Sequence, residues 1–504
     1  MGALSSPRST LSERELTVGG ESMTVLEVTP ALADAPPQAR RAEALLVSAC
    51  LIAFGAFLFF PNVLADGDTL WHVAAGEWML QHLQAPHTDP FSTPHLGQPW
   101  IAHEWLVEVL MAGAYRLLGW PGVLALYGGA YALALGAVIA HAGRWLSARG
   151  VALVLALVVA SSLVSMLVRP LIFALPLIVF WTLGLMRARD AGRAPGLRLA
   201  LLMTLWANLH GSFVLGFVLA APFALEALVE ARRKPWPVLR GWGVFAIASL
   251  AASLATPHGV QGLLYPFQIL TMKNLNAIVE WRPQDFGRFS TLQLGLFVTL
   301  FACLAKGVRV PPLRAALLLF MLYMALKQAR QEIVLAFVAP LLLARPMAAA
   351  SGQATPRTLD PPGFKVILAT GFVLMTCLRL SMPTQLADSP TKPVTAMQHV
   401  PAALAAQPVF NEYGFGGYLI FKGVHPYIDG RSDMYGDDFF GRYLRITAGD
   451  QRLFDEAVRR YGVRWTILAP DAAANLKLDV RPGWRRLYAD QYAVVHMRTA
   501  MPQP

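Results

Sequence analysis

Carboxylates, histidines and tryptophans concentrate in one segment, residues 65–104, which contains no lysine and no arginine although the chain carries 42 of them. Asp66 and Asp68 open this segment, directly after the first long apolar run. Residues of these types beside a membrane span are typical of an active site, because ionisable groups seldom approach a bilayer without a function. The same two aspartates could instead cap a helix that begins near Thr69, since Asp is a favourable N-cap residue.

Further polar residues stand between the later apolar runs. His72 lies four residues after Asp68, so the two would share one helix face. The spacing forms no recognised zinc motif, so His72 is predicted to line a site rather than to bind a metal. Ionisable groups at membrane depth usually face a protein-lined cavity. We therefore predict one external cavity whose substrate-binding candidates are His72, Glu104, Arg169, Asn208, His210, His258, Glu280, Arg282, Lys327 and Arg330.

Some of these candidates also have a purely structural interpretation. Asn208 and His210 could satisfy backbone groups at a tight turn between two helices. Lys327 and Arg330 lie three residues apart on one helix face and could extend to the membrane interface. A cationic pair opposite a carboxylate pair is also what a phosphate-bearing lipid would need, so both interpretations stay open on the sequence alone.

The composition identifies the class of protein. Of 504 residues, 55% are hydrophobic and only 14% are charged, far below the charge of a soluble domain. The net charge of +11 does not indicate a nucleic-acid partner, because the basic residues form short clusters between apolar runs, as in cytoplasmic loops. The three cysteines lie inside apolar runs, which argues against a disulfide or zinc site. Residues 1–40 are predicted to form a disordered cytoplasmic tail without a signal peptide.

Apolar runs long enough to cross a bilayer position these residues. A span needs about 20 mostly apolar residues. Eleven runs qualify, near 42–64, 121–142, 150–168, 171–188, 196–208, 212–230, 239–256, 292–306, 312–326, 332–346 and 364–382. The shorter stretch 104–118 is predicted to lie in the interface, within a first external loop of residues 65–120. Only then do the basic clusters fall on one side, with the N-terminus cytoplasmic and the C-terminus external.

The character of the chain changes after the last span. Residues 383–504 are predicted to form a small external α/β domain. We expect strands at 408–410, 426–430, 464–470 and 492–497, and helices near 416–422, 440–446 and 455–462. The glycines of YGFGGY do not form a phosphate-binding motif, so nucleotide binding is not favoured. Asp429 and Arg431 could close a turn as a pair, or form a lip over the cavity that contacts a sugar.

The segment DGDTLWHVAAGEWMLQHLQAPHTDPFSTPHLGQPWIAHEWL resembles the first external loop of GT-C-type integral membrane glycosyltransferases. It looks like the bacterial relatives of dolichyl-phosphate-mannose protein mannosyltransferases. The resemblance implies a polytopic α-helical fold of about eleven spans with interfacial helices, covering residues 41–382, and an external C-terminal domain. It places the family's acidic motif on Asp66 and Asp68, one of which would be the general base. The family's second acidic pair is not evident, and Glu104 or Glu280 could take its place.

The resemblance also implies a reaction. Members move a sugar from a polyprenyl-phosphate-linked donor to an acceptor on the external face, here a glycan, lipid or protein in the inner membrane of a bacterium. The chain would then be a hexosyl- or pentosyltransferase that inverts the sugar in a single displacement. The lipid phosphate is already a good leaving group, so a base and phosphate-binding cations would suffice. No cofactor is required, although paired carboxylates could attract Mg²⁺ or Mn²⁺.

Two other functions fit parts of the pattern. An oligosaccharide polymerase or ligase would depend on Arg169, Arg282 and Arg330 and not on the two aspartates. A lipid or solute transporter should show internal repeats with broken helices at matching positions, and no convincing repeat is present.

Overall fold

The structure is a computed structural model that describes residues 12–18, 21–27, 37–353 and 356–499. Apolar helices form a bundle, and each predicted span coincides with one of them. These helices are α1 (Pro37–Phe59), α3 (Trp105–Trp145), α4 (Ala148–Ser162), α5 (Leu171–Asp190), α6 (Leu197–Leu209), α7 (Val214–Glu230), α8 (Pro235–Ser253), α10 (Thr291–Ala305), α11 (Pro312–Lys327), α12 (Glu332–Ala350) and α13 (Phe364–Leu380). Helix α1 ends before the predicted boundary at 64, because Pro61 disfavours the helical conformation of the residue before it.

Length and hydropathy separate these helices into two groups. Among the described residues, five segments are long and apolar enough to cross a membrane: Arg40–Phe59, Trp105–Trp145, Leu171–Asp190, Gly211–Glu230 and Ala329–Ala350. Other helices of the bundle, such as α4, α6 and α10, are apolar but shorter. The polytopic helical fold is therefore present, and the number of eleven crossings stays a prediction.

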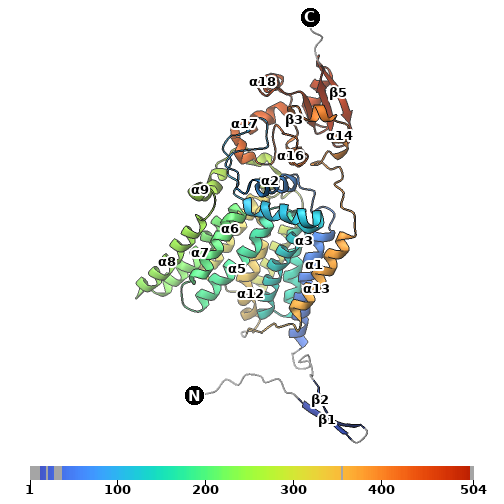
Figure 1. Cartoon of the computed structure of the whole chain (residues 1–504). Coiled ribbons are helices and arrows are strands. Elements are labelled where there is room, and N and C mark those ends of the chain that lie inside the picture. The colour runs from blue at the N-terminus through green and yellow to red at the C-terminus, as the bar shows by residue number, and fades with distance from the viewer. Residues whose placement is uncertain (1–11, 19–20, 28–36, 354–355, 500–504) are drawn as a thin grey trace.

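Two helices lie across one end of the bundle instead of along it (Figure 1). One is α2 (Asp68–His82), and the other is the first part of α3. Helix α3 breaks at Gly119, whose φ of 62° and ψ of −151° are not helical, and the chain then enters the bundle. The predicted interfacial segment 104–118 thus corresponds to the part of α3 before this break. Helix α9 (Gly259–Leu270), which the sequence analysis did not predict, lies near the same end (Figure 1).

The C-terminal domain contains a mixed sheet and several helices. Its strands β3 (Val409–Asn411), β4 (Trp465–Leu468), β5 (Trp484–Ala489) and β6 (Val494–Arg498) have the order β3-β4-β6-β5, and only the β3–β4 pair within this sheet is parallel. The helices are α14 (Val394–Gln398), α15 (Ala402–Ala405), α16 (Gly416–Phe421), α17 (Ser432–Thr447), α18 (Gln451–Tyr461) and α19 (Ala473–Asp479). The predicted small α/β domain is therefore present.

Two details of the predicted domain were wrong. Residues 426–430 are not a strand, because the backbone at Tyr427 and Ile428 bonds to the side chain of Asn411 and not to a neighbouring strand. Strand β5 was missed, since its buried Trp484 is followed by two exposed arginines that break the apolar pattern. In both cases the conformation depends on contacts with residues distant in the chain, which the local sequence does not reveal.

The C-terminal domain packs on the end of the bundle that carries α2 (Figure 1). Thr391 donates a hydrogen bond of 2.7 Å to the carbonyl of Ala65, and Lys392 donates one of 2.6 Å to that of Leu64. Tyr418 of α16 belongs to the same buried apolar cluster as the bundle helices. The C-terminal domain is therefore packed against the first loop and the bundle through hydrogen bonds and apolar contacts.

Strands β1 (Ser12–Val18) and β2 (Glu21–Glu27) pair antiparallel within the predicted tail of residues 1–40. This hairpin differs from the disorder predicted there. Polar and apolar residues alternate in the ELTV part of SERELTV and in the SMTV part of ESMTVLE, a pattern that favours strands. An isolated hairpin is nevertheless only marginally stable in water. The rest of the tail up to residue 36 lies outside the described residues.

Candidate active site

Arg169 joins the two aspartates of the first loop to a third carboxylate. It lies just before α5, and its Nη2 donates a hydrogen bond of 2.8 Å to Oδ1 of Asp66 while its Nε contacts the other oxygen of that carboxylate. The same Nη2 lies 3.4 Å from Oδ2 of Asp68, and Nη1 pairs with Glu280. One guanidinium thus holds three carboxylates from two parts of the chain, the first loop and the turn at Glu280.

The two aspartates differ in their capacity to take up a proton. Burial raises the pKa of Asp66, but the charge and hydrogen bonds of Arg169 outweigh burial, so that pKa is lowered. Burial and the negative charge of Asp66 together raise the pKa of Asp68 to about 7. Asp66 also accepts a hydrogen bond of 3.0 Å from the backbone N–H of Asp68, which closes a turn just before α2. Gly67 occupies the N-cap position of α2, so neither aspartate is its N-cap residue, and Asp68 is the titratable member of the pair.

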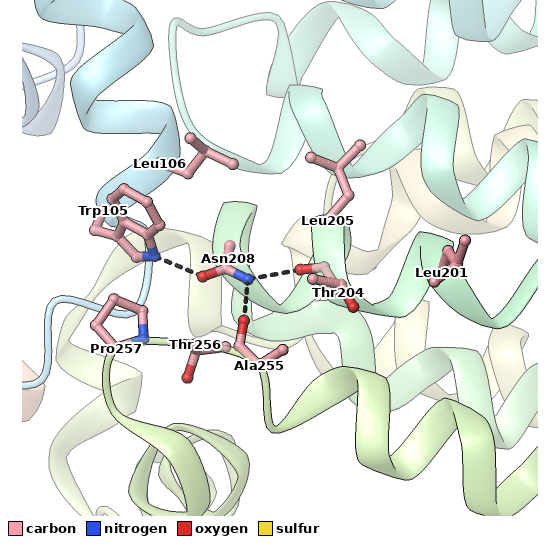
Figure 2. A pocket seen from close by; sticks show the side chains of 9 residues that line it. All are labelled: Trp105, Leu106, Leu201, Thr204, Leu205, Asn208, Ala255, Thr256 and Pro257. Carbon is pink, nitrogen blue, oxygen red and sulfur yellow. Dashed lines mark hydrogen bonds between the residues drawn. The ribbon is translucent and has the colours of Figure 1, made fainter.

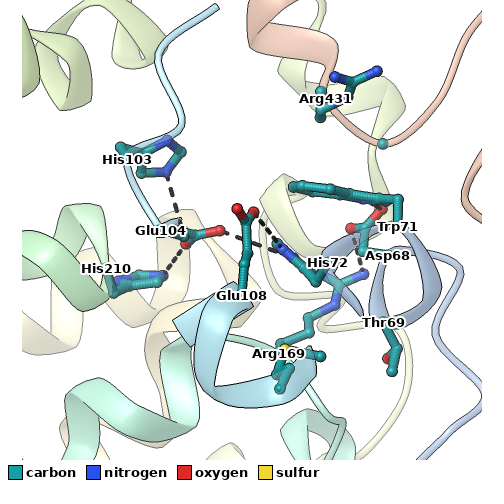
Figure 3. Close-up of polar contacts among 12 residues, drawn as sticks. Asp68, Thr69, Trp71, His72, His103, Glu104, Glu108, Arg169, His210 and Arg431 are labelled. Carbon is teal, nitrogen blue, oxygen red and sulfur yellow. Dashed lines mark hydrogen bonds and ion pairs between the residues drawn. The ribbon is translucent and has the colours of Figure 1, made fainter. Parts of the chain in front are cut away.

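Histidines and glutamates form a second cluster beside this one (Figure 3). Nδ1 of His72 lies 3.0 Å from the carboxylate of Glu108. Glu104 lies between two other histidines, with its Oε1 3.4 Å from Nε2 of His210 and 3.7 Å from Nε2 of His103. This arrangement brings together three of the predicted site residues, His72 and Glu104 from the first loop and His210, which follows α6.

Burial governs protonation in the second cluster. It raises the pKa of Glu104 to about 8 and lowers the pKa of His72 to about 3 and that of His103 to about 4. Near neutral pH the histidines are therefore neutral, and Glu104 holds a proton that it can donate. The contact between His72 and Glu108 is a hydrogen bond, whereas Glu104 approaches His210 and His103 at the longer distances given above. Neutral groups are the less costly arrangement in a buried site.

Sequence reasoning missed Glu108, which is 1% exposed. The available signal was its position four residues after Glu104 in an otherwise apolar stretch, which places both carboxyls on one face of the first part of α3.

The structure separates the predicted cations. Arg330 stacks over the ring of Trp281 at 4.5 Å, and among the described residues its guanidinium has no hydrogen bond or ion pair. Lys327 is exposed at the end of α11, where it lies 5.9 Å from the ring of Tyr323. Arg282 is exposed and donates to the carbonyls of Asn276 and Ala277. The N–H donors of Arg330 are therefore available for a ligand. Lys327 and Arg282 belong to neither of the two clusters.

Two further candidates lie beside the cluster. Asn208 accepts a hydrogen bond of 2.7 Å from the indole of Trp105 and donates to the carbonyls of Thr204 and Ala255, so its amide is already bonded (Figure 2). These residues line a largely apolar cavity of about 510 Å³ between α3, α6 and the end of α8. His258 is buried before α9, with its ring 4.9 Å from that of His87.

Asp429 and Arg431 are buried and bonded to protein groups. Nε and Nη2 of Arg431 donate to the carboxylate of Asp429 at 2.7 and 2.6 Å, and Nη1 donates to Asp89 at 2.7 Å. The side chain of Arg431 is only 2% exposed. Of the two interpretations left open, this geometry favours the closed pair, extended by a second carboxylate, Asp89 of the first loop.

Glycines allow the C-terminal domain to approach the acidic motif. A Cβ at Gly430 would overlap Oδ1 of Asp68, and one at Gly417 would overlap the carbonyl of Gly67. Gly417 of YGFGGY and Gly430 of the Asp429–Arg431 turn therefore serve close backbone packing.

Metal binding was tested on the same side chains. In the part of the chain that the structure describes, no group of three or more His, Cys, Asp or Glu residues is placed to hold a metal ion. The carboxylates of Asp66, Asp68 and Glu280 face the guanidinium of Arg169 rather than an open ligand position. The residues present do not fit a Mg²⁺ or Mn²⁺ site. That the reaction requires no cofactor stays a prediction.

Comparisons with known proteins identify the fold. No protein-family model matches the chain, and no curated protein matches its sequence. Solved structures do match: ArnT from Cupriavidus metallidurans bound to undecaprenyl phosphate has 13% identity and a TM-score of 0.50 over 91% of this chain and 99% of that one. ArnT in the apo state has 15% identity, the same TM-score and the same coverage. The Archaeoglobus fulgidus oligosaccharyltransferase in the apo form has 10% identity and a TM-score of 0.48 over 84% of this chain and 69% of that chain.

These neighbours are GT-C glycosyltransferases. The likeness to ArnT confirms the predicted fold class, a GT-C-like helical membrane protein with a small C-terminal α/β domain.

Proposed function

We propose that this protein transfers a sugar from a polyprenyl-phosphate-linked donor to an acceptor on the external face of a membrane. The observation that carries the proposal is the pair of aspartates on Arg169, of which Asp66 stays ionised and Asp68 has a pKa of about 7. A general base works best when its pKa lies near the working pH. A GT-C-like fold supports the class of reaction, and the ArnT structure with bound undecaprenyl phosphate supports the class of donor.

Asp68 is the better candidate for the base. Its side chain is 26% exposed, against 3% for Asp66, so an acceptor hydroxyl can reach it. Asp68 takes the proton of that hydroxyl as the oxygen attacks the anomeric carbon and the bond to the lipid phosphate breaks. Asp66 keeps Arg169 in place and, through its negative charge, keeps the pKa of Asp68 high. One displacement of this kind inverts the configuration of the sugar.

Arg330 is the candidate for holding the leaving phosphate. Its guanidinium has five donors, is stacked on Trp281 and is not committed to another group among the described residues. Guanidinium–phosphate pairs are strong because two donors can meet two oxygens. Arg169 is already bonded to carboxylates, so it contributes positive charge rather than free donors.

The apolar cavity beside Asn208 suits the lipid chain of the donor. It opens between helices of the bundle, and Trp105 in its wall directly follows Glu104 of the second cluster (Figure 2). Isoprene units would bury apolar surface there while the phosphate reaches the polar cluster.

The assignment of the site to the external face rests on charge, and that of the bacterial inner membrane rests on the resemblance and the composition. Among the loops that connect the bundle helices, those at the end without α2 carry most of the basic residues, which is the pattern of cytoplasmic loops. We place the N-terminus in the cytoplasm and the C-terminal domain in the periplasm. The acceptor class, and the choice between a hexose and a pentose, stay open.

The test is Asp68→Asn, with the exposed Asp285→Asn as matched control, measured as sugar transfer in cells and in vesicles supplied with polyprenyl-phosphate sugars. We expect Asp68→Asn to lower the rate by about 10²–10⁴-fold, the usual contribution of a general base, and Asp285→Asn to keep it. Native mass spectrometry should find undecaprenyl phosphate on the wild type and less on Arg330→Ala.

Unchanged transfer in both Asp68→Asn and Asp66→Asn would contradict the proposal. If Arg330→Ala alone abolished the product, the polymerase or ligase would become the better explanation. Absence of bound undecaprenyl phosphate under all conditions would favour a transporter.

A further inference from the structure

One buried arginine of the C-terminal domain lies against the aromatic residues beside the proposed base. Arg431 lies over the aromatic rings of Trp100, Phe91 and Trp71, with its Cζ 4.7, 5.2 and 5.8 Å from their centroids. Asp429 from the same domain and Asp89 from the first loop hold its guanidinium from both sides. A planar cation held in this way restricts the rings that it touches.

Trp71 links this arginine to Asp68. The indole Nε1 of Trp71 donates a hydrogen bond of 3.1 Å to Oδ1 of Asp68 (Figure 3). Trp100 packs edge-on against Trp71, with centroids 6.3 Å apart. The orientation of the indole, and hence of its N–H, depends on groups that Arg431 contacts. Gly430, the neighbour of Arg431, lies against the same carboxylate oxygen, where only glycine leaves enough room.

We propose that Arg431 is a positioning residue for the Asp68 carboxylate and acts through the indole of Trp71. The C-terminal domain thereby sets the geometry of the base in the first loop. This inference rests on the proposed function, because it concerns the residue that we assign as the base. It replaces the expectation that Asp429 and Arg431 contact the sugar.

Other charged or titratable groups also face Asp68 and must be kept constant in a test. They come from the first loop, the segment before α5, the turn at Glu280, the start of α12 and the C-terminal domain, and they are Asp66, Glu104, Arg169, Glu280, Arg330 and Tyr413. Arg431→Lys leaves all of them, and its own positive charge, in the protein. A change in the titration of Asp68 in Arg431→Lys then reflects the orientation of the Trp71 indole and not a loss of positive charge.

The experiment measures the protonation of Asp68 without a substrate. A water-soluble carbodiimide with glycine ethyl ester labels carboxyls in their protonated form, and peptide mass spectrometry gives the labelling of Asp68 at each pH in the detergent-purified protein. Labelling of the wild type should fall as the pH rises through about 7. Loss of the indole hydrogen bond disfavours the ionised form, so Trp71→Phe should move the midpoint upward by roughly one pH unit.

Arg431→Lys should move the midpoint in the same direction, and the double variant should show no more than the effect of Trp71→Phe alone, because both changes act on one hydrogen bond. Arg442→Lys, an exposed residue of α17 paired with Glu456, is the control and should leave the midpoint in place. An unchanged midpoint in Arg431→Lys, or additive shifts in the double variant, would overturn the inference.

A second pair of variants covers the case in which Arg431→Lys does not fold. Gly430→Ala inserts a methyl group against Oδ1 of Asp68 and should raise the midpoint, whereas Gly414→Ala meets only ordinary contacts of 3.6 Å and should not. Equal midpoints in these two variants would also overturn the inference. The outcomes stay separate from the proposed function, because transfer retained by Asp68→Asn would reject the base and leave the labelling results valid.

Discussion

Two aspartates of the same motif carry different tasks because their partners differ. The sequence shows them as equivalent, two residues apart beside a membrane span. In the structure Asp66 is nearly enclosed by Arg169, while Asp68 keeps part of its carboxylate exposed and has a pKa of about 7. The distinction between a structural carboxylate and a reactive one therefore depends on Arg169, which lies 103 positions after Asp66 in the chain.

Arg169→Gln should destabilise the protein by about 3 kcal/mol, because it leaves the buried Asp66 without a counter-charge. The pKa of Asp66 is lowered by folding, so this stabilisation is present above ~pH 4, the ordinary carboxyl range, and is lost as the pH falls through the lower folded value. Thermal unfolding in detergent should therefore show a large difference from the wild type at pH 7 and a smaller one below ~pH 4.

The matched control is Arg116→Gln, which removes an exposed pair with Glu77. An equal loss of thermal stability in the two variants would show that Arg169 does not hold a buried charge.

At the scale of elements, the break in α3 determines where the two glutamates of the second cluster, Glu104 and Glu108, lie. The first part of α3 carries Glu104 at its N-cap and Glu108 in its first turn, and it lies across the bundle instead of within it. Gly119 permits the break, since its φ of 62° and ψ of −151° are essentially restricted to glycine. Pro121, which lacks an N–H, begins the following part at little cost.

Gly119→Ala should therefore lower stability by about 1–3 kcal/mol, the usual cost of forcing such a backbone conformation on another residue. Gly129→Ala, in a helical part of α3 with open space around the added methyl, should be neutral or slightly stabilising. Thermal unfolding of the two variants checks this, and a Gly119→Ala protein as stable as Gly129→Ala would contradict the assigned role of the break.

At the scale of the whole molecule, segments distant in the chain meet at one end of the bundle. The first loop, the first part of α3, the segment before α5, the turn after α6 and the turn at Glu280 contribute to the two clusters, and the C-terminal domain packs beside them through Arg431. The domain packs its glycine backbone at Gly417 and Gly430 against the acidic motif, so a part of the chain more than 300 residues away forms one wall of the site.

The proposed orientation makes a prediction at this scale. In a variant whose three native cysteines are replaced by alanine, a cysteine at the exposed Leu476 of the C-terminal domain should react with a membrane-impermeant maleimide added outside spheroplasts. A cysteine at the exposed Arg193, between α5 and α6, should react only after the membrane is opened. The reverse pattern would invert the topology and place the site in the cytoplasm.

The sequence alone indicated the membrane class, the positions of the bundle helices, the segment before the break in α3 and the acidic pair Asp66 and Asp68, because hydropathy and charge asymmetry are local properties. It did not show that Arg169 pairs with these carboxylates. It could not separate Arg330 from Lys327, or Asp68 from Asp66, since three-residue spacing or a shared motif does not show which side chain finds a partner. The roles of Glu108, Trp71 and Arg431 were decided by tertiary structure alone. Their burial and hydrogen bonds arise only when the first loop, α3 and the C-terminal domain pack together, and desolvation then sets which groups hold a proton.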